Sequence, residues 1–297
     1  MKYPNFFLIG APKSGTTSMY NYLKEHPNVF MSDIKGPHFF ASDLNDHERV
    51  EEEEDYLNLF INKSKNHFAV GEASVLYLSS KKAIKNISKK IPNSKLIIIL
   101  RNPLEVIQSW HAEMVWSRLE TNEDLEDAWY KSINYSNKKH DNIKLDYQNI
   151  FKFGEQVFRV FKYFKKENVK IIYYETYLNS TKNTLSEIND FLNIPNYEKD
   201  SFLKHNTYKK YKNKFLQDFI TDPPLIILKV LNYIKIKFGI KRVGLFKKIL
   251  KYNTYHPIKP EISYHLKKSI IERYTEDVHN LSKILKKDFI ALWFKNI

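Results

Sequence analysis

A glycine-containing loop, GAPKSGTT at residues 10–17, carries the residues of this sequence best suited to bind an anion. The apolar run at residues 6–9 precedes it and predicts a buried strand, and a helical pattern begins at Thr16. Backbone N–H groups at a helix start carry partial positive charge and lack partners inside the helix, so they bind phosphate and similar groups. The loop therefore predicts an anion site formed by Lys13, Ser14, Gly15, Thr16 and Thr17.

Lys13 lies inside this loop, and its position separates the loop from the common nucleotide-binding pattern. A Walker A loop reads GxxxxGK[ST], whereas Thr16 stands here where the Walker lysine would be. This difference argues against an NTPase or an ordinary kinase. A lysine within the loop can instead neutralise charge on a departing phosphate oxygen without a metal ion. A glycine turn beside a lysine is often only a turn, but the strand before it and the helix after it favour a binding site.

A second candidate anion site follows the apolar run at residues 95–100. Arg101 comes directly after that run, and the segment NPLE at 102–105 has the features of a helix start. Ser109 lies two turns into the predicted helix, so it can face the same crevice above the strand ends as Arg101. Taken singly, an arginine paired with a surface carboxylate and a serine facing water are commoner. Beside the first loop, the pair predicts a second phosphate site.

The two sites require a sheet that brings the ends of two strands together. Short apolar runs predict buried parallel strands at 6–9, 68–70, 95–100 and 169–174. Helical patterns lie at 16–25, 104–116, 148–166 and 262–285. This alternation predicts an α/β, P-loop-like three-layer fold with a central, mostly parallel sheet flanked by helices. We expect residues 1–297 to form a single domain, with an insertion or flap around residues 204–258, where the pattern weakens.

Composition limits the compartment and the partners. The chain has no cysteine, which excludes disulfides and thiolate metal sites and fits a reducing compartment, so we expect a cytoplasmic location. No apolar stretch approaches the roughly 20 residues of a transmembrane span. The 48 lysines and arginines against 34 acids give a net charge of +14, which favours an anionic ligand without identifying it. A general lysine bias explains much of this excess, so no nucleic-acid partner is expected, although basic and aromatic residues alternate at 204–215.

The two anion sites together resemble those of the sulfotransferases that use 3′-phosphoadenosine 5′-phosphosulfate (PAPS). That family has a loop similar to PKSGTT for the phosphosulfate, and an arginine, seven residues and a serine for the 3′-phosphate; both patterns occur here in the same order. Further similar segments lie at 23–40, 71–78, 171–195 and 259–293, so the resemblance covers nearly the whole chain. It is closer to bacterial and Golgi glycan-type members than to the cytosolic steroid and phenol enzymes.

The resemblance implies a donor, a reaction and a role for each anchor residue. Lys13 through Thr17 would hold the 5′-phosphosulfate of PAPS, and Arg101 with Ser109 would hold the 3′-phosphate. The sulfuryl group would pass in line to an acceptor oxygen or nitrogen, with PAP as the product and no metal site. Lys13 would stabilise the departing phosphate oxygen. The acceptor is expected to be a small molecule, a natural product or a saccharide, and the oligomeric state stays open.

One position departs from the family pattern: Gly36 stands where glycan-type relatives usually carry a glutamate that acts as the base. The acceptor must then be deprotonated by another residue, react without a base because it is already nucleophilic, or not react at all. His38 is the first substitute, because imidazole titrates near neutral pH, and a packed structural role is its alternative. Asp33 and Glu72 follow. Three classes therefore remain: an active sulfotransferase, a catalytically impaired PAPS or PAP binder, and a basic nucleic-acid-binding protein.

Overall fold

The computed structural model describes residues 3–44, 49–135, 143–197, 208–221 and 245–295. Within them, the central sheet has five parallel strands in the order β2-β3-β1-β4-β5. Their bounds are Phe6–Gly10 (β1), Val29–Met31 (β2), Ala69–Ala73 (β3), Lys95–Leu100 (β4) and Val169–Tyr173 (β5). The predicted α/β fold with a central parallel sheet is confirmed. The short strand β2 is not predicted from the sequence, because three residues show no periodicity.

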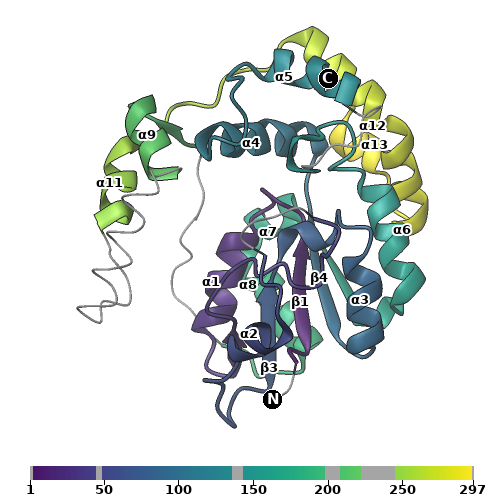
Figure 1. Cartoon of the computed structure of the whole chain (residues 1–297). Helices are drawn as coiled ribbons and strands as arrows, with labels where there is room; N and C mark the ends of the chain where they lie inside the picture. The colour runs from purple at the N-terminus through teal and green to yellow at the C-terminus, as the bar shows by residue number, and fades with distance from the viewer. Residues whose placement is uncertain (1–2, 45–48, 136–142, 198–207, 222–244, 296–297) are drawn as a thin grey trace.

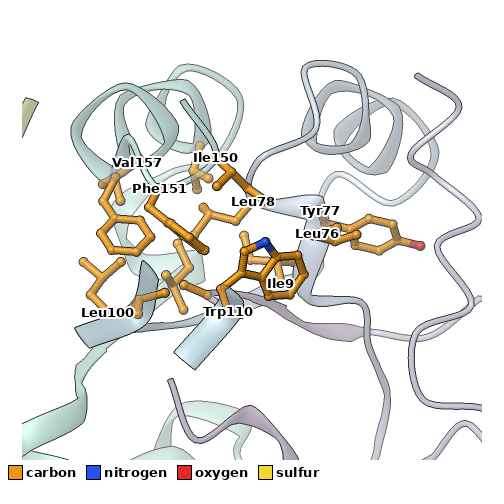
Figure 2. Packing of buried hydrophobic residues seen from close by; sticks show 14 of the residues in the cluster. Ile9, Leu76, Tyr77, Leu78, Leu100, Trp110, Ile150, Phe151 and Val157 are labelled. Atoms are coloured by element: carbon orange, nitrogen blue, oxygen red, sulfur yellow. The ribbon is translucent and has the colours of Figure 1, made fainter. Parts of the chain in front are cut away.

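Both faces of the sheet are apolar, since successive side chains of a strand point to opposite sides. Phe7 and Ile9 belong to one buried cluster, part of which Figure 2 shows, whereas Phe6 and Leu8 belong to the other. The helices that contribute to the first cluster include α3 (Ala83–Lys90), α4 (Pro103–Trp116), α6 (Phe153–Tyr163), α12 (Tyr264–Leu285) and α13 (Phe289–Trp293). The second cluster includes residues of α1 (Thr16–Glu25) and α8 (Thr181–Leu192). The three layers follow from this division.

The strand order changes direction at β1, which pairs with β3 on one side and with β4 on the other. From β1 the chain passes through α1 to β2 and β3, and only later crosses to β4 and β5. The loops that follow β1 and β4 therefore run to opposite faces and leave a crevice at the carboxyl ends of these strands. Both predicted anion sites come directly after these two strands.

Helix α6 begins later than the sequence predicts, at Phe153 rather than at residue 148. The carboxylate of Asp277, which belongs to α12, accepts hydrogen bonds from the backbone N–H groups of Gly154 and Glu155 at 2.8 and 2.9 Å. These N–H groups have no partner within the helix, so Asp277 caps its first turn. The start of α6 thus depends on a side chain from a distant part of the sequence.

A small ribbon lies beside the C-terminal end of α4 (Figure 1). It consists of the antiparallel strands β6 (Lys210–Tyr211) and β7 (Thr254–Tyr255) together with α9 (Lys214–Thr221) and α11 (Leu245–Asn253). Gln217 donates a hydrogen bond of 2.6 Å to the carbonyl of Trp116, and Arg118 pairs with Asp218. These elements belong to the predicted insertion around 204–258, of which residues 204–207 and 222–244 lie outside the described residues.

Figure 1 also labels three further helices of the described residues. They are α2 (Glu53–Asn58), α5 (Leu125–Tyr135) and α7 (Tyr174–Asn179), with short turns of 3-10 helix at Val75–Tyr77, Ile143–Leu145 and Lys166–Asn168. Helix α7 starts directly after β5 and packs near the loop after β1, so its tyrosines lie beside the first predicted anion site.

Candidate functional site

A cavity of about 210 Å³ lies where the loops after β1 and β4 meet. Six of the predicted anion-binding residues line it: Lys13, Gly15, Thr16, Thr17, Arg101 and Ser109. Ser14 lies beneath the loop instead, where its fully buried hydroxyl donates a hydrogen bond of 3.3 Å to the carbonyl of Pro12. The fold therefore brings both predicted anion sites into one cavity, with Ser14 supporting the loop from below.

Gly15 forms the turn between the loop and α1. Its φ is +82°, and a Cβ there would lie 3.0 Å from Cε1 of Tyr177 and 3.2 Å from Cε2 of Tyr174. Both the left-handed backbone and the close tyrosine rings require glycine. Helix α1 begins at the next residue, Thr16, and no side chain caps it through a hydrogen bond at its N-cap. The positive end of this helix thus forms part of the cavity wall.

Arg101 connects the two predicted anion sites. Its Nη1 donates a hydrogen bond of 2.9 Å to the carbonyl oxygen of Lys13, which has a φ of +59°. Its Nε and Nη2 donate to Oε2 of Glu105 at 2.9 and 2.6 Å, and the guanidinium stacks over the ring of Tyr174, 4.2 Å from the centroid. These contacts hold Arg101 in one orientation and couple it to the shape of the loop.

Ser109 reaches the cavity because α4 starts where the sequence predicts. The side chain of Asn102 accepts a hydrogen bond of 3.0 Å from the backbone N–H of Leu104, and Pro103 is the first helical residue. Two turns later, Ser109 lines the cavity together with Lys35 and other cationic side chains. The lining is therefore positively charged, as an anion site requires.

Glu113 is a site residue that reasoning from the sequence missed. It lies one turn after Ser109 on α4, with Oε2 3.0 Å from Nζ of Lys13 and Oε1 3.2 Å from Nζ of Lys209. Burial favours the neutral acid, but the charges and hydrogen bonds of the two lysines outweigh burial and lower the pKa of Glu113. The spacing from Ser109 was a usable signal, because residues four apart share a helix face.

Lys209 connects this cavity to a second one of about 100 Å³. Its Nζ lies 3.3 Å from the centroid of the Trp116 ring, and burial lowers its pKa while Glu113 opposes that effect. Ala112, Tyr208 and Lys209 line both cavities. The other residues that line the second cavity are His111, Val115, Trp116, Glu123, Lys210, Tyr211 and Tyr255. The second cavity is thus an aromatic extension of the first.

His38, the predicted base, lies outside the lining of both cavities. Its side chain is buried, and its ring meets that of Tyr77 edge to face at 6.1 Å between centroids. Its backbone N–H donates a hydrogen bond of 3.0 Å to Oγ of Ser74. Gly36 has a φ of +83°, and a Cβ there would lie 3.1 Å from Nε2 of His38. His38 therefore packs beneath the turn at Gly36, and its catalytic role stays a prediction.

Glu72 and Asp33, the other carboxylates considered as bases, lie in opposite environments. Glu72 is fully buried and accepts hydrogen bonds from Tyr56 at 3.0 Å, from Tyr77 at 2.8 Å and from Ser74 at 2.6 Å. Burial raises its pKa to about 7, although these hydroxyl groups act in the opposite direction. Asp33 is exposed, with Oδ1 3.9 Å from Nζ of Lys24. Glu72 thus has a structural role, because it anchors three hydroxyl groups beneath the loop that contains His38.

The described residues show neither a metal-binding group of side chains nor a helix that could span a membrane. In the part of the chain that the structure describes, no three His, Cys, Asp or Glu side chains group as a metal site requires. Over the same ranges, every helix is too short or too polar to cross a bilayer.

Comparison with known proteins identifies the family. The profile of the sulfotransferase domain matches residues 3–224. The membrane-associated sulfotransferase kil1 of Dictyostelium discoideum is 31% identical over 126 residues, which cover 41% of this chain and 26% of that protein. Carbohydrate sulfotransferase 15 of Rattus norvegicus is 26% identical over 253 residues, covering 64% of this chain and 44% of the relative. The chain therefore spans less than half the length of either relative.

Solved structures agree on the fold. A sulfotransferase from Alicyclobacillus acidocaldarius superposes with a TM-score of 0.72 at 22% identity, covering 98% of this chain and 99% of that one. Mouse sulfotransferase SULT7A1 complexed with PAP gives a TM-score of 0.51 at 14% identity, covering 95% and 87%. Because the domain profile matches well over half of its residues, the chain belongs to the sulfotransferase domain family.

Proposed function

We propose that this member of the sulfotransferase family moves a sulfuryl group from PAPS to a hydroxyl or nitrogen of an acceptor and releases PAP. One observation carries the proposal: Lys13 and Arg101, from loops after different strands, line the same cavity and are joined by a hydrogen bond of 2.9 Å. A donor with two phosphate groups needs two such anchors. The PAP bound in the mouse structural neighbour supports this choice of donor.

The residues of the cavity fit the two ends of the donor. Lys13, Thr16, Thr17 and the start of α1 would hold the 5′-phosphosulfate, with backbone N–H groups of the loop adding to the site. Arg101 and Ser109 would hold the 3′-phosphate, because a guanidinium offers several fixed donors and a hydroxyl offers one more. Lys13 would neutralise the charge that develops on the departing phosphate oxygen. No metal ion takes part in this scheme.

The acceptor is proposed to be a small molecule, a natural product or a saccharide. The aromatic extension supports this class, because Trp116, Tyr208, Tyr211 and Tyr255 offer ring faces beside the donor cavity. The name of carbohydrate sulfotransferase 15 supports a saccharide in particular. The predicted flap at residues 204–258 fits the same scheme, since Tyr208 and Tyr211 belong to it.

Two parts of the proposal rest on the sequence alone. His38 as the base is inferred from its position in the family motif, and it lies outside the cavity lining. A cytoplasmic location is supported by the absence of cysteine.

An alternative is a catalytically impaired PAPS or PAP binder, and Gly36 favours it because a glutamate base is missing there. A nucleic-acid-binding role has less support: Lys209, one of the basic residues at 204–215, pairs with Glu113 and stacks on Trp116 instead of joining an exposed patch.

Mass spectrometry of a metabolite extract incubated with the protein and PAPS tests the proposal. We expect at least one metabolite to gain the mass of one SO3 group, with stoichiometric PAP, and Lys13→Ala to abolish the gain. PAP binding in the same preparation without transfer to any acceptor, across small-molecule and saccharide libraries, would instead identify an impaired binder. Binding of RNA that falls steeply as salt rises, with no PAP binding, would favour the nucleic-acid-binding role.

A further inference from the structure

Glu113 is the one carboxylate among the described residues that line the donor cavity. Both of its oxygens are engaged, Oε2 by Lys13 at 3.0 Å and Oε1 by Lys209 at 3.2 Å. In the proposed reaction, Lys13 stabilises the departing phosphate oxygen. Lys13 must therefore leave Glu113, with which it pairs in this structure, before it can act. A carboxylate that pairs with the leaving-group lysine lies within reach of the reacting atoms.

The position of Glu113 along α4 points to the acceptor side of the cavity. Ser109, one turn earlier on the same face, belongs to the proposed 3′-phosphate site. Ala112, which directly precedes Glu113, and Lys209 line both the donor cavity and its aromatic extension. Glu113 binds Lys209, and Lys209 stacks on Trp116 in that extension. Glu113 thus lies at the junction where donor and acceptor would meet.

We propose that Glu113, in place of His38, is the general base of the transfer and that it also holds Lys13 until the donor binds. This inference rests on the proposed sulfotransferase function. The acceptor oxygen or nitrogen forms a bond to sulfur while the bond from sulfur to the 5′-phosphate oxygen breaks, and that oxygen keeps the electron pair. The acceptor proton passes to Glu113 and later to solvent. Lys13 leaves Glu113 and stabilises the new charge on the phosphate oxygen.

The charges around Glu113 suit this exchange. Two ammonium groups contact it in the cavity, those of Lys13 and Lys209, and Lys35 also lines the cavity. Lys13 and Lys209 keep the carboxylate ionised in the donor-free protein, which a base requires. When Lys13 turns to the donor, Glu113 loses one cation and gains anionic neighbours, and both changes raise its proton affinity. Donor binding therefore strengthens the base as it frees the lysine.

The test compares Glu113→Gln and Glu113→Asp with the unchanged protein, using the acceptor found by mass spectrometry and PAP as the binding probe. Glu187→Gln is the matched control. Glu187 belongs to α8, away from the cavity, and its Oε2 lies 2.7 Å from Nζ of Lys170. Removing a general base lowers turnover by about 100-fold or more. We expect that loss in Glu113→Gln, a partial recovery in Glu113→Asp, and loss of the acidic limb of the pH–rate profile in Glu113→Gln.

PAP binding supplies the second readout. Because Glu113→Gln frees Lys13, PAP affinity should stay equal or rise, whereas a merely structural role would lower it along with turnover. Turnover of Glu113→Gln close to that of the unchanged protein, or a loss of PAP affinity in this variant, overturns the proposal and leaves the sulfotransferase function intact. An unchanged protein that binds PAP and transfers nothing overturns both.

Discussion

The Nη1 atom of Arg101 donates a hydrogen bond of 2.9 Å to the carbonyl oxygen of Lys13, which ties the end of β4 to the loop after β1. Arg101 also pairs with Glu105 on α4 and stacks on Tyr174 of α7. Three separate elements therefore fix one guanidinium. A change at Arg101 alters the loop as well as the proposed 3′-phosphate site.

Arg101→Ala should weaken PAP binding by about 10- to 100-fold, because charge-assisted hydrogen bonds to a phosphate are lost. Isothermal titration with PAP measures this effect. Adenosine 5′-phosphate, which lacks the 3′-phosphate, serves as the control ligand, and its affinity should fall much less. An equal loss for both ligands would contradict the assignment of Arg101 to the 3′-phosphate and would point to loop distortion alone. Arg101→Lys should recover little, since the ammonium cannot reproduce the planar fork.

Lys13→Ala should reduce turnover by at least about 100-fold, because removing one group that stabilises developing charge has an effect of this size. Initial rates of PAP release at saturating PAPS check it. Lys24→Ala is the control and should keep normal rates, because Lys24 lies in the last turn of α1 with an exposed ammonium. If Lys13→Ala turned over at a rate near normal, the leaving-group role would be wrong.

Gly15→Ala should destabilise the protein by about 1–3 kcal/mol, because a residue with a Cβ is strained at positive φ. The new methyl group would also press on Tyr177, 3.0 Å from the Cβ position. Thermal unfolding measures the loss, and PAP titration of the folded variant should show weaker binding. An unchanged melting temperature together with normal PAP affinity would mean that the loop tolerates another conformation.

Glu72 predicts a pH dependence of stability. Its pKa of about 7 in the folded chain lies above its ordinary value of 4.5, so the folded state binds the proton more tightly than the unfolded state. The corresponding stabilisation is full below pH 4.5 and is lost as the pH rises through 7. Between about pH 5 and 8, we expect the unchanged protein to lose about 1–3 kcal/mol that Glu72→Gln does not lose.

Urea unfolding of both proteins at several pH values measures this difference. Glu187→Gln, which removes an exposed carboxylate, is the control and should follow the unchanged protein. Parallel stability curves for the unchanged protein and Glu72→Gln would contradict the raised pKa.

The sequence predicts His38 as the base, whereas the structure points to Glu113. His38→Asn should lower turnover less than Glu113→Gln, because His38 lies outside the cavity lining whereas Glu113 is part of it. Side-by-side initial rates with one acceptor decide the order. A larger loss in His38→Asn, with normal folding by circular dichroism, would restore His38 as the base.

The sequence by itself was enough to predict the parallel sheet and to put the residues of the two predicted anion sites directly after two of its strands. Each site is a local pattern of strand, loop and helix, and such patterns follow from residues that are neighbours in the chain. The left-handed φ of Gly15 and the helix start at Thr16 are local features of this kind, although the tyrosine rings packed against Gly15 are not. The place of Arg101 in the chain, between the end of β4 and the capped start of α4, is also local, whereas its contacts with Lys13 and Tyr174 are not. The four longer strands show as apolar runs because both faces of the sheet are buried.

Only the tertiary structure decided which residues meet across the cavity. Glu113 contacts Lys13 and Lys209, which lie about a hundred residues away on either side of it in the sequence. That meeting depends on β1 and β4 lying side by side and on the ribbon packing at the end of α4. The capping of α6 by Asp277 has the same origin. No local pattern encodes such contacts, because they arise from the order in which strands pair and helices pack.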